Sequence, residues 1–258
     1  MDSLDHVVIV VPRLAEAEVL FRSASFTVTP GGRHDAVPTE NALIGLADGS
    51  YLELLAARDP AAREEWRARS GTSAWERHLK GVSAIARRFL PTMAGPDGVG
   101  DWALCTAALL ARAADLRRAG HAAAGPVPMS RVRRGGERLA WELLLPESRR
   151  LPFWIADRSS RDRRVPGSAQ ATTHANGASG VAVVRIRAEN VPTTALELGD
   201  LLGALPSVTP NGATRLEMNG WRIEVTPGAP EGLHAVSLAG VASLPEDIRA
   251  LGVWPEAD

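Results

Sequence analysis

Two polar residues in apolar surroundings are the first candidates for chemistry. His6 opens the run Val7-Val8-Ile9-Val10-Val11, and Glu53 lies between Leu52 and Leu54. The β-branched run predicts a buried strand, and a desolvated carboxylate requires a partner. The two side chains would therefore converge on a divalent metal or a substrate. In the alternative interpretation, His6 is a satisfied core histidine and Glu53 a surface residue on an edge strand.

The elements that would position these residues follow a recurring order. The first copy has strands at 4–12, 26–29, 41–46 and 49–55, a helix at 14–21 and a turn at 30–32. Two helices are expected at 61–69 and 73–88. The second copy has strands at 101–106, 126–133, 139–145 and 151–156, with a helix at 109–119. Both copies read β-α-β-β-β, which indicates an internal repeat.

A third copy begins after a polar connection. Its strands are expected at 180–186, 214–218 and 220–225 and its helix at 192–202, so that Glu224 falls where Glu53 does. Residues 234–238 and 245–251 would be the strand and helix of a truncated fourth copy. The connection at 158–173 is predicted to be a linker. The six arginines between 149 and 164 would be a solvated part of it, or an anion site in the alternative reading.

Composition excludes several classes of protein. The 258-residue chain is 45% hydrophobic and 23% charged with a net charge of −1, as expected for a globular protein without a general attraction to nucleic acid or lipid. No apolar run reaches the roughly 18 residues of a membrane span, and no signal pattern precedes the first strand, so a cytoplasmic location is expected. The single cysteine, Cys105, is interpreted as an inert strand residue.

Several segments together resemble a known superfamily. They are Leu4-Asp5-His6, Pro30-Gly31-Gly32-Arg33-His34, Thr39-Glu40-Asn41, Tyr51-Leu52-Glu53-Leu54 and Leu151-Pro152-Phe153-Trp154-Ile155. In this order they resemble the vicinal oxygen chelate superfamily, and within it the glyoxalase-like domain proteins. The resemblance covers residues 4 to about 157 well and extends loosely to His174-Ala175-Asn176-Gly177.

The resemblance implies an α+β fold of tandem βαβββ modules, of the glyoxalase, bleomycin-resistance and dihydroxybiphenyl dioxygenase type, with concave mixed sheets. Residues 1–157 would form a glyoxalase-like domain of two modules, 1–58 and 100–157, with a helical insert at 60–90. Residues 158–173 would be the linker, and residues 174–258 a third module with a terminal strand and helix.

The resemblance also implies a divalent metal (Zn, Fe, Mn, Ni or Mg) in the concavity. Only His6 and Glu53 carry over as ligands, with Glu53 also as the catalytic acid or base. Trp102 and Trp154 would stand where the second module would have its histidine and glutamate. Third-ligand candidates are His174, Glu224 and His234. His34, Asn41 and Trp154 would contact substrate; alternatively, His34 and Asn41 stabilise the loop from Pro30 to Pro38.

Two functional hypotheses follow from this resemblance. The chain is either a metal-dependent lyase, isomerase or dioxygenase acting on a small oxygenated compound, or a metal-free protein that binds such a compound or works on it by shape alone, like a cyclase. The partner is a small molecule, with no nucleic acid and no membrane. The modules would pair within one chain or across a homodimer.

Overall fold

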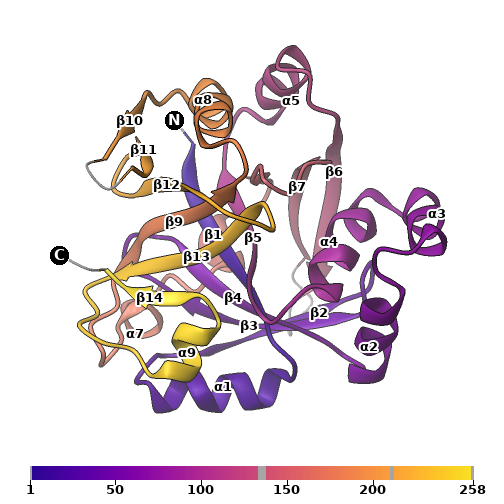
Figure 1. Cartoon of the computed structure of the whole chain (residues 1–258). Coiled ribbons are helices and arrows are strands. Elements are labelled where there is room, and N and C mark those ends of the chain that lie inside the picture. Colours follow the sequence, from indigo (N-terminus) through magenta and orange to yellow (C-terminus); the bar gives the residue numbers. More distant parts are fainter. Residues whose placement is uncertain (1, 133–137, 210–211, 257–258) are drawn as a thin grey trace.

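The chain folds into two curved sheets with helices packed around them (Figure 1). The computed structural model describes residues 2–132, 138–209 and 212–256. The larger hydrophobic core lies between the sheets and includes Val7, Trp102, Val184 and Trp221. Strand β13 of the second sheet contacts β5 of the first. This mixed α+β arrangement, with sheets curled into half-barrels, is the fold class that the sequence predicts.

The first sheet contains two β-α-β-β-β modules joined side by side. Its strand order is β2-β3-β4-β1-β5-β8-β7-β6. The first module consists of β1 (Ser3–Val10), α1 (Leu14–Ser23), β2 (Thr29–His34), β3 (Thr39–Gly45) and β4 (Tyr51–Ala57). The second consists of β5 (Gly98–Cys105), α5 (Leu109–Arg118), β6 (Ala123–Val132), β7 (Arg138–Pro146) and β8 (Phe153–Asp157). The antiparallel pair β1 and β5 joins them within one chain.

One strand boundary differs from the sequence expectation. The strand expected at 26–29 begins at Thr29, and the predicted turn at 30–32 lies inside β2. Gly31 permits this, because a Cβ there would stand 2.0 Å from Oδ1 of Asn41. The close approach lets the Gly32 N–H donate to Asn41 Oδ1 at 2.7 Å, which ties β2 to β3.

Three helices, not the expected two, connect the modules. They are α2 (Pro60–Arg69), α3 (Ser73–Gly81) and α4 (Ala84–Ala94). The helix expected at 73–88 is interrupted because Ser83 caps a new helix, its hydroxyl accepting from the Ala86 N–H. Arg88 fastens α4 to the sheet through two hydrogen bonds to buried Asp101, at 2.7 and 2.8 Å. The insert therefore covers the concave face of the first sheet.

The second sheet repeats the first, with two strands missing. Its order is β10-β11-β12-β9-β13-β14. Its elements are β9 (Gly180–Ala188), α8 (Val191–Leu202), β10 (Pro206–Val208), β11 (Thr214–Glu217), β12 (Arg222–Pro227), β13 (Gly232–Ala239), α9 (Glu246–Ala250) and β14 (Val253–Pro255). The predicted third copy and truncated fourth copy are present, with β10 and β14 as strands that the sequence pattern did not reveal.

The connection between the sheets is mostly exposed but is buried at Arg164 and Val165. It forms two short helices, α6 (Arg161–Arg164) and α7 (Ala169–Thr172). Arg164 is only 6% exposed, because it lies among charged partners from the first sheet. The expectation of a solvated arginine run is therefore wrong at Arg164. Among the described residues, no helix is long and apolar enough to cross a membrane.

Candidate functional site

A cavity of about 680 Å³ lies on the concave face of the first sheet, beside α4. The first module supplies most of its polar lining, which includes His6, His34, Thr39, Asn41, Tyr51 and Glu53, together with apolar Val37, Leu43 and Leu55. The second module and α4 supply mainly apolar side chains, Ile85, Phe89, Met129, Trp141, Leu143, Phe153 and Ile155, together with Ser130 and Arg138. The lining around His6 and Glu53 is therefore more polar than the lining from α4 and the second module.

His6 is held on three sides. Its Nδ1 lies 2.7 Å from Oδ1 of Asp5, its ring stacks on Tyr51 with centroids 4.6 Å apart, and the ring of Phe153 meets it edge to face. Burial lowers the pKa of His6 to about 4; Glu53 opposes this shift and Arg164 adds to it. The imidazole is therefore neutral near pH 7.

Glu53 faces His6 from β4. Its Oε2 lies 3.4 Å from Nε2 of His6, and its Oε1 accepts a hydrogen bond of 2.6 Å from Nδ2 of Asn41. Asn41 is itself oriented by the Gly32 N–H. One oxygen of Glu53 is thus fixed, while the other points towards the imidazole.

The contact with Asp5 determines which ring nitrogen of His6 carries the proton and which one presents a lone pair to Glu53. An ionised carboxylate only accepts hydrogen bonds, so Nδ1 of the neutral ring carries the proton and Nε2 presents its lone pair. Two acceptor atoms, Nε2 of His6 and Oε2 of Glu53, then face each other across 3.4 Å. This arrangement suits a divalent cation, because metal to ligand distances of about 2.1 Å let both atoms reach one ion. Asp5 is the partner that a ligating imidazole usually has on its other nitrogen.

The described residues supply no third protein ligand to this pair. Their one cluster of three metal-binding side chains is Asp5, Cys105 and Asp157, whose two carboxylates already bind Arg164. Burial, together with Asp157, raises the pKa of the Cys105 thiol. An ion held by His6 and Glu53 would therefore complete its shell with water or substrate oxygens.

The second module offers apolar side chains where ligands would be expected. His6 in β1 is opposite Ala103 in β5, so the two residues are equivalent in the two modules. Within the modules, His6 pairs with Tyr51 of β4, and Ala103 pairs with Phe153 of β8. The counterparts of His6 and Glu53 are thus Ala103 and Ile155. The expectation that Trp102 and Trp154 take these places is wrong by one residue, and in a strand one residue changes the face.

Both tryptophans lie on the opposite face of the sheet. Trp102 and Trp154 belong to the core between the sheets, and Trp154 is 1% exposed. The indole N–H of Trp154 donates to Asp2 at 2.7 Å. Trp154 does not line the cavity, so the structure does not support it as a substrate contact; Trp141 and Phe153 are the aromatic residues there.

The three third-ligand candidates lie elsewhere. His174 makes hydrogen bonds to the Gly45 carbonyl and the Thr27 N–H, and burial lowers its pKa. Glu224 and His234 belong to the second sheet, in β12 and β13. None of the three lines the cavity. The structure therefore does not bring them to His6 and Glu53.

His34 and Asn41 do lie in the cavity wall, and both also have structural partners. Nδ1 of His34 is 2.9 Å from the Thr39 hydroxyl, and Asn41 joins Glu53 to Gly32. Asn41 therefore lines the cavity and also stabilises the β2 strand, while substrate contact by His34 and Asn41 stays a prediction.

Sequence reasoning missed Asp5, Tyr51 and Arg164. Asp5 adjoins His6, and Tyr51 lies two residues before Glu53. The acidic residue next to His6 could have been recognised from the sequence as a partner of the imidazole. An irregular register between Leu4 and His6 leaves Asp5 without a partner in β5, which frees its side chain to reach the ring. Arg164 is distant in sequence and carried no signal of its own.

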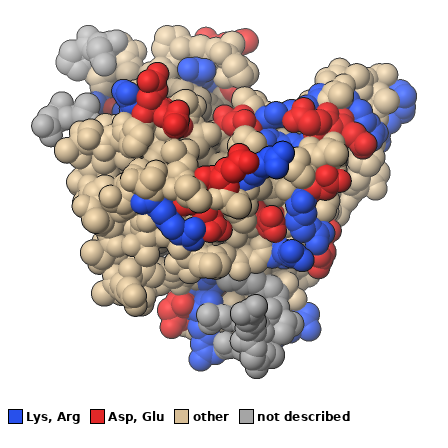
Figure 2. Space-filling view, turned by 90° about the horizontal axis from the view of Figure 1, so that it is seen from below, with Lys and Arg blue, Asp and Glu red and all other residues tan. Residues whose placement is uncertain are grey.

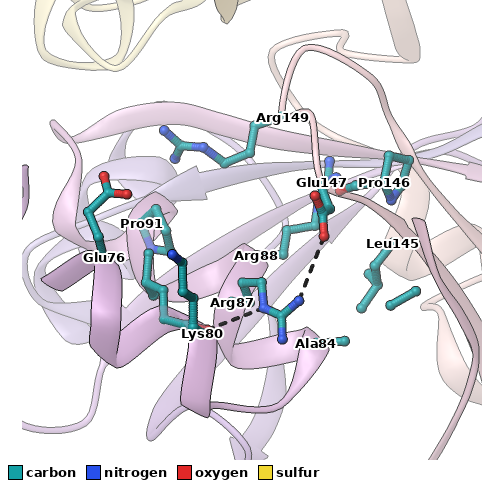
Figure 3. Close-up of a pocket in the computed structure, with 12 residues that line it drawn as sticks. Glu76, Lys80, Ala84, Arg87, Arg88, Pro91, Leu145, Pro146, Glu147 and Arg149 are labelled. Carbon is teal, nitrogen blue, oxygen red and sulfur yellow. Dashed lines mark hydrogen bonds and ion pairs between the residues drawn. The ribbon is translucent and has the colours of Figure 1, made fainter. Parts of the chain in front are cut away.

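A second cavity, of about 500 Å³, lies outside this site, between α3, α4 and the end of β7 (Figure 3). Four basic side chains line it, Lys80, Arg87, Arg88 and Arg149, with Glu76 and Glu147. Arg87 lies 3.7 Å from Glu147, and Arg88 is bound to Asp101. Positive and negative side chains lie side by side on the face in Figure 2.

The chain matches one protein family. Residues 4–202 match the family described as the glyoxalase-like domain. No curated protein matches the chain.

Three examples illustrate the solved structures that share its fold. A hypothetical protein from Staphylococcus aureus has a TM-score of 0.73 at 16% identity, with 99% of each chain covered. The Mn(II)-bound glyoxalase from Novosphingobium aromaticivorans has a TM-score of 0.50 at 16% identity, covering 98% of this chain and 70% of that one. An extradiol ring-cleaving dioxygenase from B. fuscum has a TM-score of 0.52 at 12% identity, covering 92% and 56%.

Proposed function

The chain belongs to the glyoxalase-like domain family of the vicinal oxygen chelate superfamily, and on this premise we propose that it is a metal-dependent enzyme that acts on a small oxygenated organic compound. A single observation carries the proposal. The Nε2 lone pair of His6 and the Oε2 oxygen of Glu53, two buried residues, face each other at 3.4 Å in the cavity, with Asp5 behind the imidazole. Two facing acceptors are stabilised by a cation between them.

The residues around this pair define what the chain itself would do. A divalent cation held there would supply Lewis-acid stabilisation of negative charge on a substrate oxygen. Glu53 would take or return a proton through Oε2 when that oxygen moves off the cation, while the Asn41 amide holds Oε1. α4 contributes Ile85 and Phe89 to the cavity wall.

The lining favours a substrate with two chemically different ends. Its oxygen atoms would lie at His6 and Glu53, and a hydrocarbon portion would lie against the apolar side chains of α4 and the second module. The volume of about 680 Å³ lies within the range of pockets that enclose drug-sized ligands. A compound with adjacent oxygens and an apolar ring or branched chain fits these conditions best.

A second candidate, a metal-free binding protein or a cyclase-like catalyst that works by shape, is favoured by one observation. The positions of the second module that correspond to His6 and Glu53 carry Ala103 and Ile155, so half of a four-residue ligand set is replaced by apolar groups. Such a protein would hold its ligand by shape and apolar contact. Metal content separates the two candidates.

The deciding experiment is metal analysis of protein purified without a metal-affinity column, followed by addition of Zn, Fe, Mn, Ni and Mg. We expect close to one divalent ion per chain and a melting temperature that falls with chelator. His6→Gln and Glu53→Gln should lose the ion and the chelator effect. A wild-type melting temperature unmoved by chelator, with no ion bound at any tested concentration, would leave the metal-free candidate.

We also propose that nucleic acid is not a partner. The net charge is −1 despite 28 arginines and one lysine, so release of counterions from a nucleic acid would contribute little. Salt-sensitive micromolar binding to duplex or single-stranded DNA at physiological ionic strength would contradict this.

A further inference from the structure

Arg164 binds three side chains of the first sheet, two of which contact His6, although it lies outside both modules of that sheet. Its Nε donates to Asp157 at 2.6 Å, and its Nη2 donates to Asp157 at 3.0 Å and to Asp5 at 2.8 Å. Its Nη1 donates to Asp5 at 3.2 Å and to the Tyr51 hydroxyl at 3.1 Å. All three nitrogens of the guanidinium thus donate to side chains of the first sheet.

Two of these partners are the residues that hold the imidazole. Asp5 accepts from Nδ1 of His6, and Tyr51 stacks on the ring. Arg164 binds both oxygens of Asp5 in a bidentate contact, which fixes the carboxylate in rotation as well as in position. Arg161 of the same short helix also contacts Asp5. The orientation of Asp5 therefore depends on α6.

The orientation of Asp5 matters because His6 has another hydrogen-bond partner available. If Asp5 turned away, the ring proton could move to Nε2 and be donated to Oε2 of Glu53, which is already 3.4 Å away. This alternative tautomer would join the two candidate ligand atoms to each other. It would satisfy both groups without an ion and remove the lone pair that an ion requires.

We propose that Arg164 is a positioning residue that selects the Nδ1–H tautomer of His6 and so keeps Nε2 and Glu53 available to a bound ion. The selection of the tautomer stands on the contacts alone, and only its consequence for ion binding rests on the proposed function. The segment 158–173 thus completes the site rather than merely connecting two domains.

The test measures the tautomer directly in metal-free protein. ¹⁵N NMR of the imidazole distinguishes a protonated from an unprotonated ring nitrogen, and we expect wild-type His6 to carry its proton on Nδ1. In Arg164→Met the Nε2–H form should become substantial. Arg158→Gln is the matched control, because exposed Arg158 is in the same segment but binds half-buried Glu142 instead of Asp5. It should retain the wild-type tautomer.

Arg164→Lys is a second variant, to be used if Arg164→Met does not fold. Lysine keeps the positive charge but lacks the planar fork that reaches Asp5, Asp157 and Tyr51 at once. We expect this variant also to show the Nε2–H form. A folded Arg164→Lys or Arg164→Met protein in which His6 remains wholly in the Nδ1–H form would overturn the inference.

Mn²⁺ binding provides the second readout. Titration followed by the electron paramagnetic resonance signal of free Mn²⁺ should give a dissociation constant about 10- to 100-fold higher in Arg164→Met than in wild type, as for lost partners of metal ligands elsewhere. Loss of the Nδ1–H form with unchanged Mn²⁺ affinity would refute the consequence for ion binding. Absence of Mn²⁺ binding to wild type would count against the proposed function. The ¹⁵N NMR measurement of the His6 tautomer would still test the role of Arg164.

Discussion

The two half-barrels of this chain have the same construction and different contents. In each, the first strand pairs in parallel with the strand that ends the module and antiparallel with the first strand of the next copy. Even the register irregularity recurs, since Asp5 in β1 and Ala182 in β9 both lack a partner in the neighbouring strand. The backbone thus offers the same positions twice.

The side chains at these positions differ. Pairing by register makes four residues of the first sheet equivalent to four of the second: Asp5 to Ala182, His6 to Val183, Tyr51 to Arg222 and Glu53 to Glu224. Only the carboxylate is shared. The second half-barrel therefore lacks the imidazole and the acid behind it.

The shared carboxylate has opposite surroundings in the two sheets. Glu224 is bound by Arg185, Arg215 and Arg222 at 3.2, 3.0 and 3.3 Å. Burial disfavours its charge, but the hydrogen bonds and charges of these arginines outweigh burial and lower its pKa. Glu53 has one amide partner and faces a neutral ring. The comparison teaches that strand topology provides a place for a carboxylate, and that its neighbours decide between an ion-pair network and a reactive site.

The sharpest way to break this comparison is to remove each carboxylate in turn. Glu53→Gln should weaken Mn²⁺ binding by at least about 100-fold, because one of two protein ligands is lost. Glu224→Gln should leave Mn²⁺ affinity within about two-fold, because Glu224 is already bound by three arginines. Isothermal titration calorimetry of both variants measures the difference. An equal loss in both would show that the half-barrels are not functionally distinct.

Substitution of Glu224 should lower the stability of the fold more than substitution of Glu53 does, the reverse of their effects on Mn²⁺ affinity. Glu224→Ala leaves three half-buried arginines without their shared counterion and should lower the free energy of unfolding by about 2 to 3 kcal/mol. Glu53→Gln should cost less than about 1 kcal/mol, because the amide still accepts from Asn41. Urea denaturation at pH 7 gives both values. A larger loss for Glu53→Gln would reverse the assignment of structural and functional carboxylates.

A pH effect should come from β13 of the second sheet. Burial, with Arg187 and Arg185 nearby, lowers the pKa of His234 from 6.5 to about 4. His234 therefore binds a proton less readily in the folded chain than in the unfolded chain. Its contribution to the free energy of unfolding is complete above pH 6.5 and is lost as the pH falls towards 4. His234→Gln should reduce the loss of unfolding free energy over this window by about 1 to 2 kcal/mol. Denaturation curves at pH 7, 5.5 and 4.5 would reveal it, and an unchanged slope would contradict it.

The smallest effect should come from neighbours on opposite faces of β8. Trp154→Phe removes the hydrogen bond to Asp2 and should cost about 1 kcal/mol of stability, without changing Mn²⁺ affinity. Phe153→Leu, on the cavity side, should instead change the binding of apolar ligands. Thermal melts and Mn²⁺ titration separate the two faces, and a drop in Mn²⁺ affinity for Trp154→Phe would place the tryptophan in the site after all.

The repeated order of elements and the candidate pair could be predicted from the chain itself. Alternation and β-branched runs are local properties, so the strands containing His6 and Glu53 were recognisable wherever the strands lay in space. Each of the two residues is also polar on an apolar strand, a contrast that needs no tertiary information. The match between Glu53 and Glu224 followed from the same periodicity, and the register confirms it.

Tertiary structure alone decided which side chains share the cavity. Trp102 and Trp154 were assigned to the wrong face because an offset of one residue inverts a strand, and composition does not reveal the register between modules. His174, Glu224 and His234 have ligand chemistry but are held elsewhere by their own strands and partners. Arg164 reaches Asp5 from 159 residues away, and a contact over such a separation depends on how the two sheets and α6 pack, which no local pattern contains.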